Sequence, residues 1–136
     1  MPNVRHILET SLYVEDLDRS EQFYCKVFGC RRRLGDDRMR ALGIASGQML
    51  LLFVRGKSSE GDETPQGRIP GHDGVGPLHV ALAIDADDVE AWRLHLAEQN
   101  IEIISRVRPE QGGESLYFRD PDNHLIELAT PSIWDV

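Results

Sequence analysis

The sequence contains an internal repeat, and this repeat limits the fold more than any other feature. Residues 9–18 read ETSLYVEDLD and residues 79–88 read HVALAIDADD. In each copy an apolar strand pattern runs into acidic residues and then into a helical pattern. A potential metal ligand, Glu9 or His79, stands five residues before the last strand residue of its copy. Two such halves imply a pseudo-two-fold axis with the strand-borne ligands near it, so the repeat predicts a shared site.

Length and composition exclude several classes of protein. A chain of 136 residues makes one domain, or two half-sized modules that share a core. The formal net charge of -8 argues against nucleic acid and anionic membranes as partners. No apolar stretch approaches the roughly 20 residues that span a bilayer, and the start of the chain lacks an apolar signal core. We therefore expect a cytoplasmic protein, whose Cys25 and Cys30 stay reduced.

The first half has the pattern of one strand, one helix and three further strands. Alternation over residues 7–14 places Ile7, Glu9, Ser11 and Tyr13 on one face. A helix is expected to follow, with Asp18 and Glu21 as a capping box and Gly29 at its end. Turn signals then delimit strands at about 30–34, 38–45 and 48–55.

Residues 56–77 separate the halves and carry six glycines and three prolines, so we expect a connecting loop that is either mobile or functional. The second half repeats the order of elements. A strand at 78–84 precedes a helix at about 87–99, for which Asp87 and Glu90 form a second capping box. The predicted fold class is α+β with the pattern βαβββ twice, and its second half ends with strands at about 101–107, 114–119 and 124–129.

Three ligand-type side chains fall on the strand faces away from the predicted helices. Alternation separates His79 from the apolar Val80 and Leu82, and it places Glu9 and Glu127 in the same way on their own strands. A single strand histidine is more often structural, and a single strand glutamate usually faces solvent. Matching positions in a repeat favour the interpretation of Glu9, His79 and Glu127 as a joint site.

Two stretches resemble the vicinal oxygen chelate superfamily, the glyoxalase, bleomycin-resistance and dioxygenase group. They are LYVEDLDRS at residues 12–20, with the FY and FG that follow, and LYFRDPDNHLIEL at residues 116–128. The resemblance implies a single domain over 1–136, with paired βαβββ modules at 5–55 and 78–130 that form a cup-shaped mixed sheet. It also implies a divalent metal ion (Mn, Fe, Ni, Co or Zn) bound by Glu9, His79 and Glu127.

The resemblance further implies an enzyme that acts on a small oxygen-rich molecule. Its substrate would bind through adjacent oxygens, with the metal ion as Lewis acid and Glu9 or Glu127 as general base. Lyase, isomerase, transferase and dioxygenase reactions all occur in the superfamily. Two-module chains of this group commonly form homodimers, so we expect a homodimer, with ligands from one chain or from both.

The chain also departs from the subfamilies that it resembles. Histidine is common at the position of Glu9, and glyoxalase I has a fourth ligand on a strand that here reads MLLLFV at residues 49–54. The potassium-binding loop of the fosfomycin thiol transferases is missing, and extradiol dioxygenases usually have four modules. Two alternatives therefore stay open: a metal-free binding protein of the bleomycin-resistance type, and a fosfomycin-type thiol transferase. The three ligands and the low aromatic content of 7% favour an enzyme over the binding protein.

Other polar residues are candidates for contact with the substrate. Four of them share the inward strand face: Ser11, Tyr13, Tyr117 and Arg119. Arg119 could bind an anionic group or pair with a neighbouring aspartate. His72 lies in the loop at 68–74, where it is either a contact in a lid or a surface histidine. His124 has the parity of the apolar face and is not predicted to be a ligand.

Overall fold

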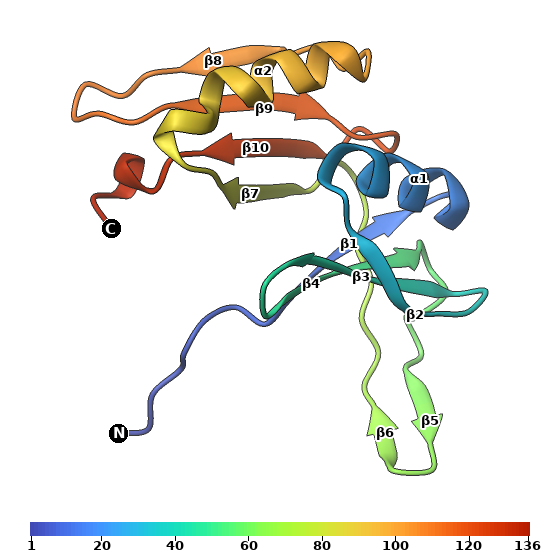
Figure 1. Ribbon diagram of the computed structural model, residues 1–136. Helices are drawn as coiled ribbons and strands as arrows, with labels where there is room; N and C mark the ends of the chain where they lie inside the picture. Colours follow the sequence, from blue (N-terminus) through green and yellow to red (C-terminus); the bar gives the residue numbers. More distant parts are fainter. The chain divides into compact units, whose positions relative to one another are not determined.

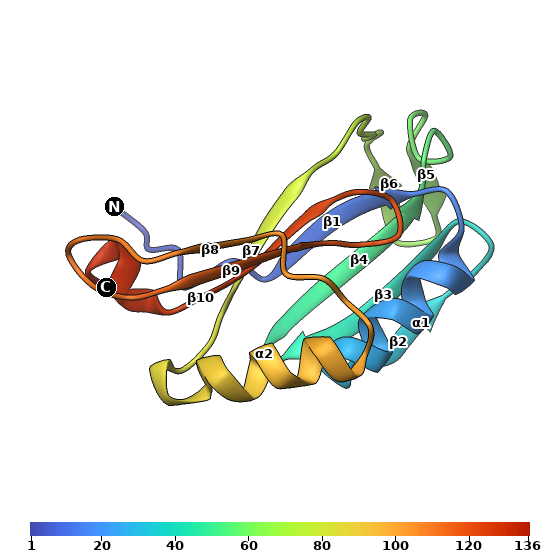
Figure 2. The same cartoon turned by 90° about the horizontal axis from the view of Figure 1, so that it is seen from above.

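Each half of the chain folds into a four-stranded mixed sheet with one helix on one face (Figure 1, Figure 2). The computed structural model describes residues 1–136, which divide into two units, Met1–Val75 and Gly76–Val136. Both units contain the order βαβββ, so the predicted α+β fold with two copies of this pattern is confirmed.

The first sheet has the strand order β1-β4-β3-β2. Its elements are β1 (Glu9–Val14), α1 (Leu17–Phe28), β2 (Arg31–Gly35), β3 (Met39–Ala45) and β4 (Gln48–Val54). Strand β1 pairs in parallel with β4, with Glu9 opposite Met49 and Val14 opposite Val54. Strand β1 therefore lies directly beside β4, the last strand of the βαβββ pattern.

Helix α1 begins earlier than the sequence pattern predicted. The Asp16 side chain accepts a hydrogen bond of 3.0 Å from the backbone N–H of Arg19, which makes Asp16 the N-cap. The predicted capping box of Asp18 and Glu21 is wrong. The expected end at Gly29 is confirmed, because this residue has φ +65° and donates its N–H to the Cys25 carbonyl.

The segment between the two sheets is more ordered than a plain loop. It contains a short hairpin of β5 (Asp62–Thr64) and β6 (Gly67–Ile69), which extends from the first unit (Figure 1). The hydroxyl of Thr64 donates to the Gly67 carbonyl across the turn at 2.6 Å. The expectation of a connecting loop over 56–77 is thus corrected: a two-stranded element occupies its middle.

The second sheet has the equivalent order, β7-β10-β9-β8. Its elements are β7 (His79–Ala83), the 3₁₀ turn η1 (Ala86–Asp88), α2 (Val89–Glu98), β8 (Ser105–Val107), β9 (Ser115–Arg119), β10 (Leu125–Ala129) and the 3₁₀ turn η2 (Pro131–Trp134). Strand β10 is central, parallel to β7 and antiparallel to β9. The agreement of the two strand orders confirms that the sequence repeat is a structural repeat.

The second helix also departs from its expected start. A 3₁₀ turn occupies Ala86–Asp88, so α2 begins at Val89 and its N-cap, Asp88, makes no side-chain capping bond. The predicted capping box of Asp87 and Glu90 is therefore wrong. Glu90 instead accepts hydrogen bonds from Arg93 and Arg106, both at 3.0 Å.

The core of each unit lies between its helix and the apolar face of its sheet. Leu12, Val14, Leu42, Leu50 and Leu52 are buried in the first unit, and Leu96, Leu116, Phe118, Ile126 and Leu128 in the second. As predicted, His124 belongs to the apolar side: it is fully buried and accepts a hydrogen bond of 2.9 Å from the backbone N–H of Leu78 at Nδ1. No helix combines the length and apolar character required to cross a membrane.

Candidate metal centre

Two of the three predicted ligands meet on the helix-free face of the second sheet. Strand β10 runs parallel to β7 in a register that places Leu125 opposite His79 and Glu127 opposite Ala81. Glu127 is therefore the diagonal neighbour of His79 on the same face. Their side chains approach to 3.2 Å between Nε2 of His79 and Oε2 of Glu127.

The remaining ring nitrogen of His79 fixes how the imidazole presents itself to Glu127. Nδ1 lies 2.9 Å from the carbonyl oxygen of Leu125. A carbonyl only accepts, so Nδ1 carries the hydrogen, and the Nε2 of a neutral ring then directs a lone pair at the carboxylate. Two facing lone pairs repel each other unless a proton or a metal cation lies between them. The pair is thus arranged around a positive charge.

The geometry of the pair fits a first-row divalent ion. Two ligand atoms, each about 2.1 Å from such an ion, are about 3.0 Å apart at a right angle and about 3.4 Å apart at the tetrahedral angle. The observed 3.2 Å lies between these values. Neither unit alone contains three or more His, Cys, Asp or Glu side chains that could hold a metal.

Glu127 is held in place by two hydroxyl groups. Its side chain is only 7% exposed, and Oε1 accepts a hydrogen bond of 2.6 Å from the hydroxyl of Ser115. Tyr117 lies directly opposite Glu127 in the β9–β10 register. Burial raises the pKa of Tyr117, and the charge of Glu127 and a hydrogen bond to it raise this pKa further. Such partners orient a metal-binding carboxylate.

The sequence analysis missed Ser115, although a signal for it was present. The turn that joins the last two strands fixes their pairing, with Tyr117 opposite Glu127 and Ser115 two residues further along the same face. Aligning the two strands about that turn would have placed the Ser115 hydroxyl near the carboxylate.

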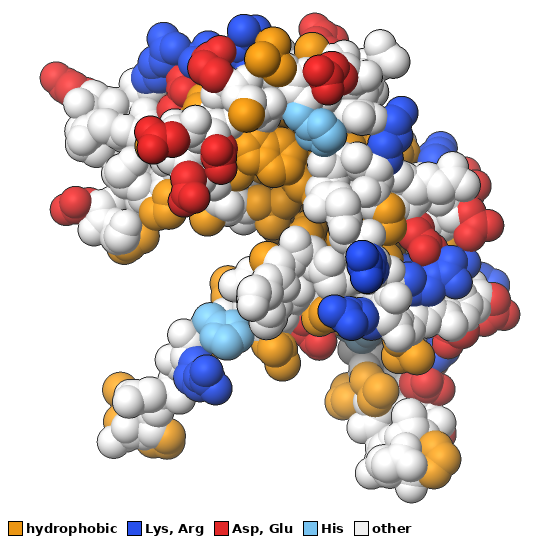
Figure 3. Space-filling view, in the orientation of Figure 1, with side chains coloured by type: hydrophobic (Ala, Val, Ile, Leu, Met, Phe, Trp, Pro, Cys, Tyr) orange, Lys and Arg blue, Asp and Glu red, His pale blue; other side chains and the backbone are white.

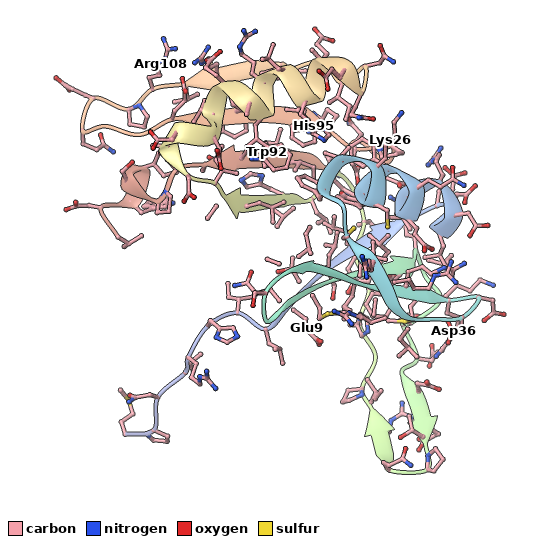
Figure 4. All side chains as sticks on the ribbon, in the orientation of Figure 1. Glu9, Lys26, Asp36, Trp92, His95 and Arg108 are labelled. Carbon is pink, nitrogen blue, oxygen red and sulfur yellow. The ribbon has the colours of Figure 1, made fainter.

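The third predicted ligand, Glu9, belongs to the first unit. It is exposed at the start of β1, opposite Met49 (Figure 4). Ser11 follows on the same strand face and is half-buried, and Tyr13 is buried. The strand alternation that predicted a common face for these three residues is present in the structure, since the alternate residues Leu12 and Val14 lie in the core.

A short segment covers part of this face in the first unit. His72 is half-buried, with Nδ1 2.7 Å from the hydroxyl of Tyr13 and its ring edge-on to Phe53 at a centroid distance of 4.5 Å. Burial and the charge of Asp73 raise the pKa of Tyr13, so the phenol keeps its proton and can donate it to the imidazole. The next glycine, Gly74, lies against the Tyr13 ring, where an added Cβ would come within 2.4 Å. His72 thus anchors this segment to β1 and β4.

Arg119 is exposed at the end of β9. Leu125 separates it from His79 in the strand register, so all three lie in one row across the sheet. Its guanidinium donates a hydrogen bond of 3.2 Å to the Asn123 carbonyl. Contact between Arg119 and an anionic group of the substrate stays a prediction.

An open hollow of about 520 Å³ lies elsewhere, at the N-terminus of α1. Glu15, Asp16, Asp18 and Arg40 contribute to its lining. Figure 3 shows acidic and basic side chains close together on this face of the molecule. Arg40 pairs with both Asp18 and Glu21 at 3.0 Å. None of the predicted site residues lines this hollow, so it does not belong to the candidate centre.

Comparison with known proteins defines the class. The family model of the Glyoxalase/Bleomycin resistance protein/Dioxygenase superfamily matches residues 4–128, and the chain belongs to this superfamily, as its motifs predicted. The chain is similar to the metallothiol transferase FosB of Bacillus licheniformis, with 29% identity over 97% of this chain and 77% of the relative. A probable lactoylglutathione lyase of Synechocystis shares 30% identity, over 93% of this chain and 95% of the relative.

Solved structures agree with this assignment. The crystal structure of a lactoylglutathione lyase from Agrobacterium tumefaciens has a TM-score of 0.90 and 31% identity, and the match covers 99% of this chain and 100% of that one. The fosfomycin resistance protein FosX from Listeria monocytogenes shares the fold, with a TM-score of 0.65 and 22% identity. The relatives thus include a lactoylglutathione lyase and a metallothiol transferase. These are the two types of protein from which this sequence differs at individual positions.

Proposed function

We propose that this protein is a metal-dependent enzyme in which Glu9, His79 and Glu127 bind one divalent ion and a small substrate takes the open coordination positions. The observation that carries the proposal is the His79–Glu127 pair, whose 3.2 Å approach favours a proton or a metal cation between the two groups. The participation of Glu9 rests on the sequence repeat and on the family resemblance.

In the second unit, a backbone carbonyl and two hydroxyl groups fix the orientation of His79 and Glu127. The Leu125 carbonyl keeps the Nε2 lone pair of His79 directed at the cation, and Ser115 and Tyr117 hold the Glu127 carboxylate. When bound, a divalent ion would supply Lewis-acid stabilisation of negative charge on a substrate oxygen. The raised pKa of Tyr117 keeps its phenol protonated at neutral pH, so it can donate to a carboxylate or to a substrate oxygen.

The two carboxylates suit different roles. Glu127 is buried and accepts hydrogen bonds from two hydroxyl groups, which favours a permanent ligand. Glu9 is exposed, so it is the better candidate for a general base that would take a proton from the substrate. The proposed substrate contacts are Ser11, Tyr13, His72, Tyr117 and Arg119.

The names of the relatives suggest a substrate class. A lactoylglutathione lyase and a metallothiol transferase both act on thiol compounds by name, so we propose a substrate formed from a small thiol and an oxygen-rich electrophile. The lyase-type reaction is favoured by the agreement in fold and length with the Agrobacterium protein. The second candidate is a thiol transferase that opens the epoxide of fosfomycin, and the FosB similarity over 97% of this chain favours it.

Activity measurements distinguish the lyase-type reaction from the thiol-transferase reaction. The protein is first reloaded with Mn, Fe, Ni, Co or Zn in separate samples. One assay offers methylglyoxal with glutathione, and the other offers fosfomycin with glutathione or cysteine. Turnover of either mixture is expected for the wild type and for the control Glu98→Gln, which changes an exposed glutamate on α2. Glu127→Gln is expected to abolish it. A chain that binds fosfomycin or bleomycin unchanged and without metal would be a sequestering protein instead.

We also propose a cytoplasmic homodimer, and mixed variants test whether its sites are shared. Glu9→Ala and His79→Ala chains, each inactive alone, are unfolded and refolded together. If each site takes Glu9 from one subunit and the other two ligands from its partner, part of the metal binding returns on mixing. No recovery in a mixed dimer would place all three ligands within one chain. A monomer by light scattering would contradict the homodimer.

A further inference from the structure

We propose that Cys25 and Cys30 form a dithiol that a small disulfide, such as oxidised glutathione, converts to an intrachain disulfide bond. The two thiols are free, and their sulfur atoms are 3.6 Å apart, which is close to van der Waals contact. The proposal concerns the first unit away from the ligand-bearing face, and it does not depend on the proposed function.

The end of α1 brings the two thiols together. Cys25 lies in the last turn of the helix, and Gly29 reverses the chain in the left-handed conformation. Cys30 follows at once and precedes β2, so its side chain returns to the helix beside Cys25. A disulfide requires a sulfur–sulfur distance of about 2.05 Å. Side-chain rotation has to close the remaining gap between the two sulfur atoms.

The different burial of the two thiols sets the order of the reaction. Cys25 is half-buried and accessible, whereas Cys30 is 7% exposed. Burial, together with a hydrogen bond to Cys25 and its charge, raises the pKa of Cys30 to about 12. Cys25 is therefore the attacking thiol.

The exchange is balanced without any further reactant. The Cys25 thiolate attacks one sulfur of oxidised glutathione, the glutathione disulfide breaks, and one reduced glutathione leaves. Cys30 then loses its proton to water and attacks the Cys25 sulfur, which releases the second glutathione. The bond to Cys25 removes the hydrogen bond and the charge that raised the pKa of Cys30, so the second step becomes easier than it would be in the free dithiol. Two thiols are oxidised and one disulfide is reduced.

Mass spectrometry and thiol counting on the full chain test the proposal. After incubation with oxidised glutathione, the wild type is expected to lose both thiols and two hydrogen atoms per chain, with no glutathione attached. Cys30→Ser is expected to stop with one glutathione on Cys25, because its second thiol is missing. Cys25→Ser is expected to keep the buried Cys30 thiol unmodified.

Three results would overturn the proposal. The first is a folded wild type that keeps both thiols. The second is a wild type in which glutathione stays attached to Cys25 as the final product. The third is a disulfide between two chains, seen as a dimer on a non-reducing gel, in place of the intrachain bond. Circular dichroism of each serine variant confirms that the comparison is made on folded protein.

Discussion

The two sheets have the same strand order but use their helix-free faces differently. In the first unit, Tyr13 and Phe53 are covered by the segment that His72 anchors, and Glu9 stands exposed at the edge. In the second unit, Glu127 is buried among a histidine and two hydroxyl-bearing side chains. One copy of the module thus presents a covered aromatic surface, and the other a polar cluster that we propose binds a cation. The repeat fixes the backbone, and the inward residues decide the chemistry.

The helices of the two units also differ, in how their N-termini are capped. Asp16 caps α1 through its side chain, while α2 begins after a 3₁₀ turn and has no side-chain cap. In Figure 4, Trp92 and His95 lie on α2, with their rings edge to face at 5.6 Å. Equivalent elements of a repeat therefore need not be stabilised by equivalent contacts.

The apolar face of the second sheet is expected to contribute most of the stability of this unit, and Phe118 of β9 tests this most strongly. Phe118 is fully buried beneath the helix side, so Phe118→Ala should lower the free energy of unfolding by about 3–5 kcal/mol. The control Ile104→Ala changes an exposed apolar residue and should stay within about 0.5 kcal/mol of the wild type. Urea denaturation measures both, and equal losses would show that this face is not the core.

The polar cluster of the second unit should depend on its hydroxyl groups. Ser115→Ala removes the 2.6 Å hydrogen bond to Glu127 and should weaken metal affinity by about 10–100-fold, the usual effect of losing such a partner. Ser105→Ala, on the exposed edge strand β8, is the matched control. Calorimetric titration with Zn²⁺ or Co²⁺ gives the dissociation constants. Unchanged affinity in the Ser115 variant would contradict the role of Ser115 in orienting a metal-binding Glu127.

Only α1 has a side-chain cap, so loss of the capping aspartate should destabilise the chain at α1 and much less at α2. Asp16→Ala should destabilise the chain by about 1 kcal/mol, because the N–H of Arg19 loses its acceptor. Asp88→Ala, at the equivalent position of α2, should cost only a few tenths of that value, since its side chain caps nothing. Thermal unfolding of both variants shows whether the two starts really differ; equal losses would contradict the assignment.

The two units should lose stability in a similar way at low pH, because each holds one carboxylate between two arginines. Hydrogen bonds from Arg32 and Arg40 lower the pKa of Glu21, and those from Arg106 and Arg108 lower that of Glu114. A lowered folded-state pKa stabilises the fold above the usual value of 4.5, and the effect disappears as the pH falls through the lowered value.

Glu21→Gln and Glu114→Gln should therefore weaken the protein at pH 7 and flatten its loss of stability below pH 4.5, by a small amount in each case. Chemical denaturation at a series of pH values measures the slope. A slope identical to that of the wild type in both variants would show that neither cluster contributes.

The sequence predicted the features that depend on periodicity. Alternation placed His79 and Glu127 on one face, and the structure brings them to 3.2 Å. The true cap of α1 was not predictable in this way, because Glu15, Asp16 and Asp18 are all acidic and only the extended backbone of Asp16 selects it. Local composition shows which residues can cap a helix, but the backbone path decides which one does.

Other features depend on contacts between strands, which a linear pattern does not contain. The hairpin of β5 and β6 has two strands of three mostly polar residues, too short for a recognisable alternation. The predicted strand at 101–107 forms only from Ser105, since the N–H of Ile101 bonds back to Leu96. His72 and Tyr13 are 59 positions apart, and only the fold of the intervening chain brings them together.

The central claim is that the His79–Glu127 pair binds a metal ion, and elemental analysis of protein purified without chelators tests it most directly. Wild type and the control Glu98→Gln should carry about one first-row divalent ion per chain, as expected for a single family-type site. Glu127→Gln, nearly identical in shape, should carry none while it remains folded. Full metal content in this variant, or no metal in the wild type after Mn, Fe, Ni, Co and Zn have each been offered, would contradict the account.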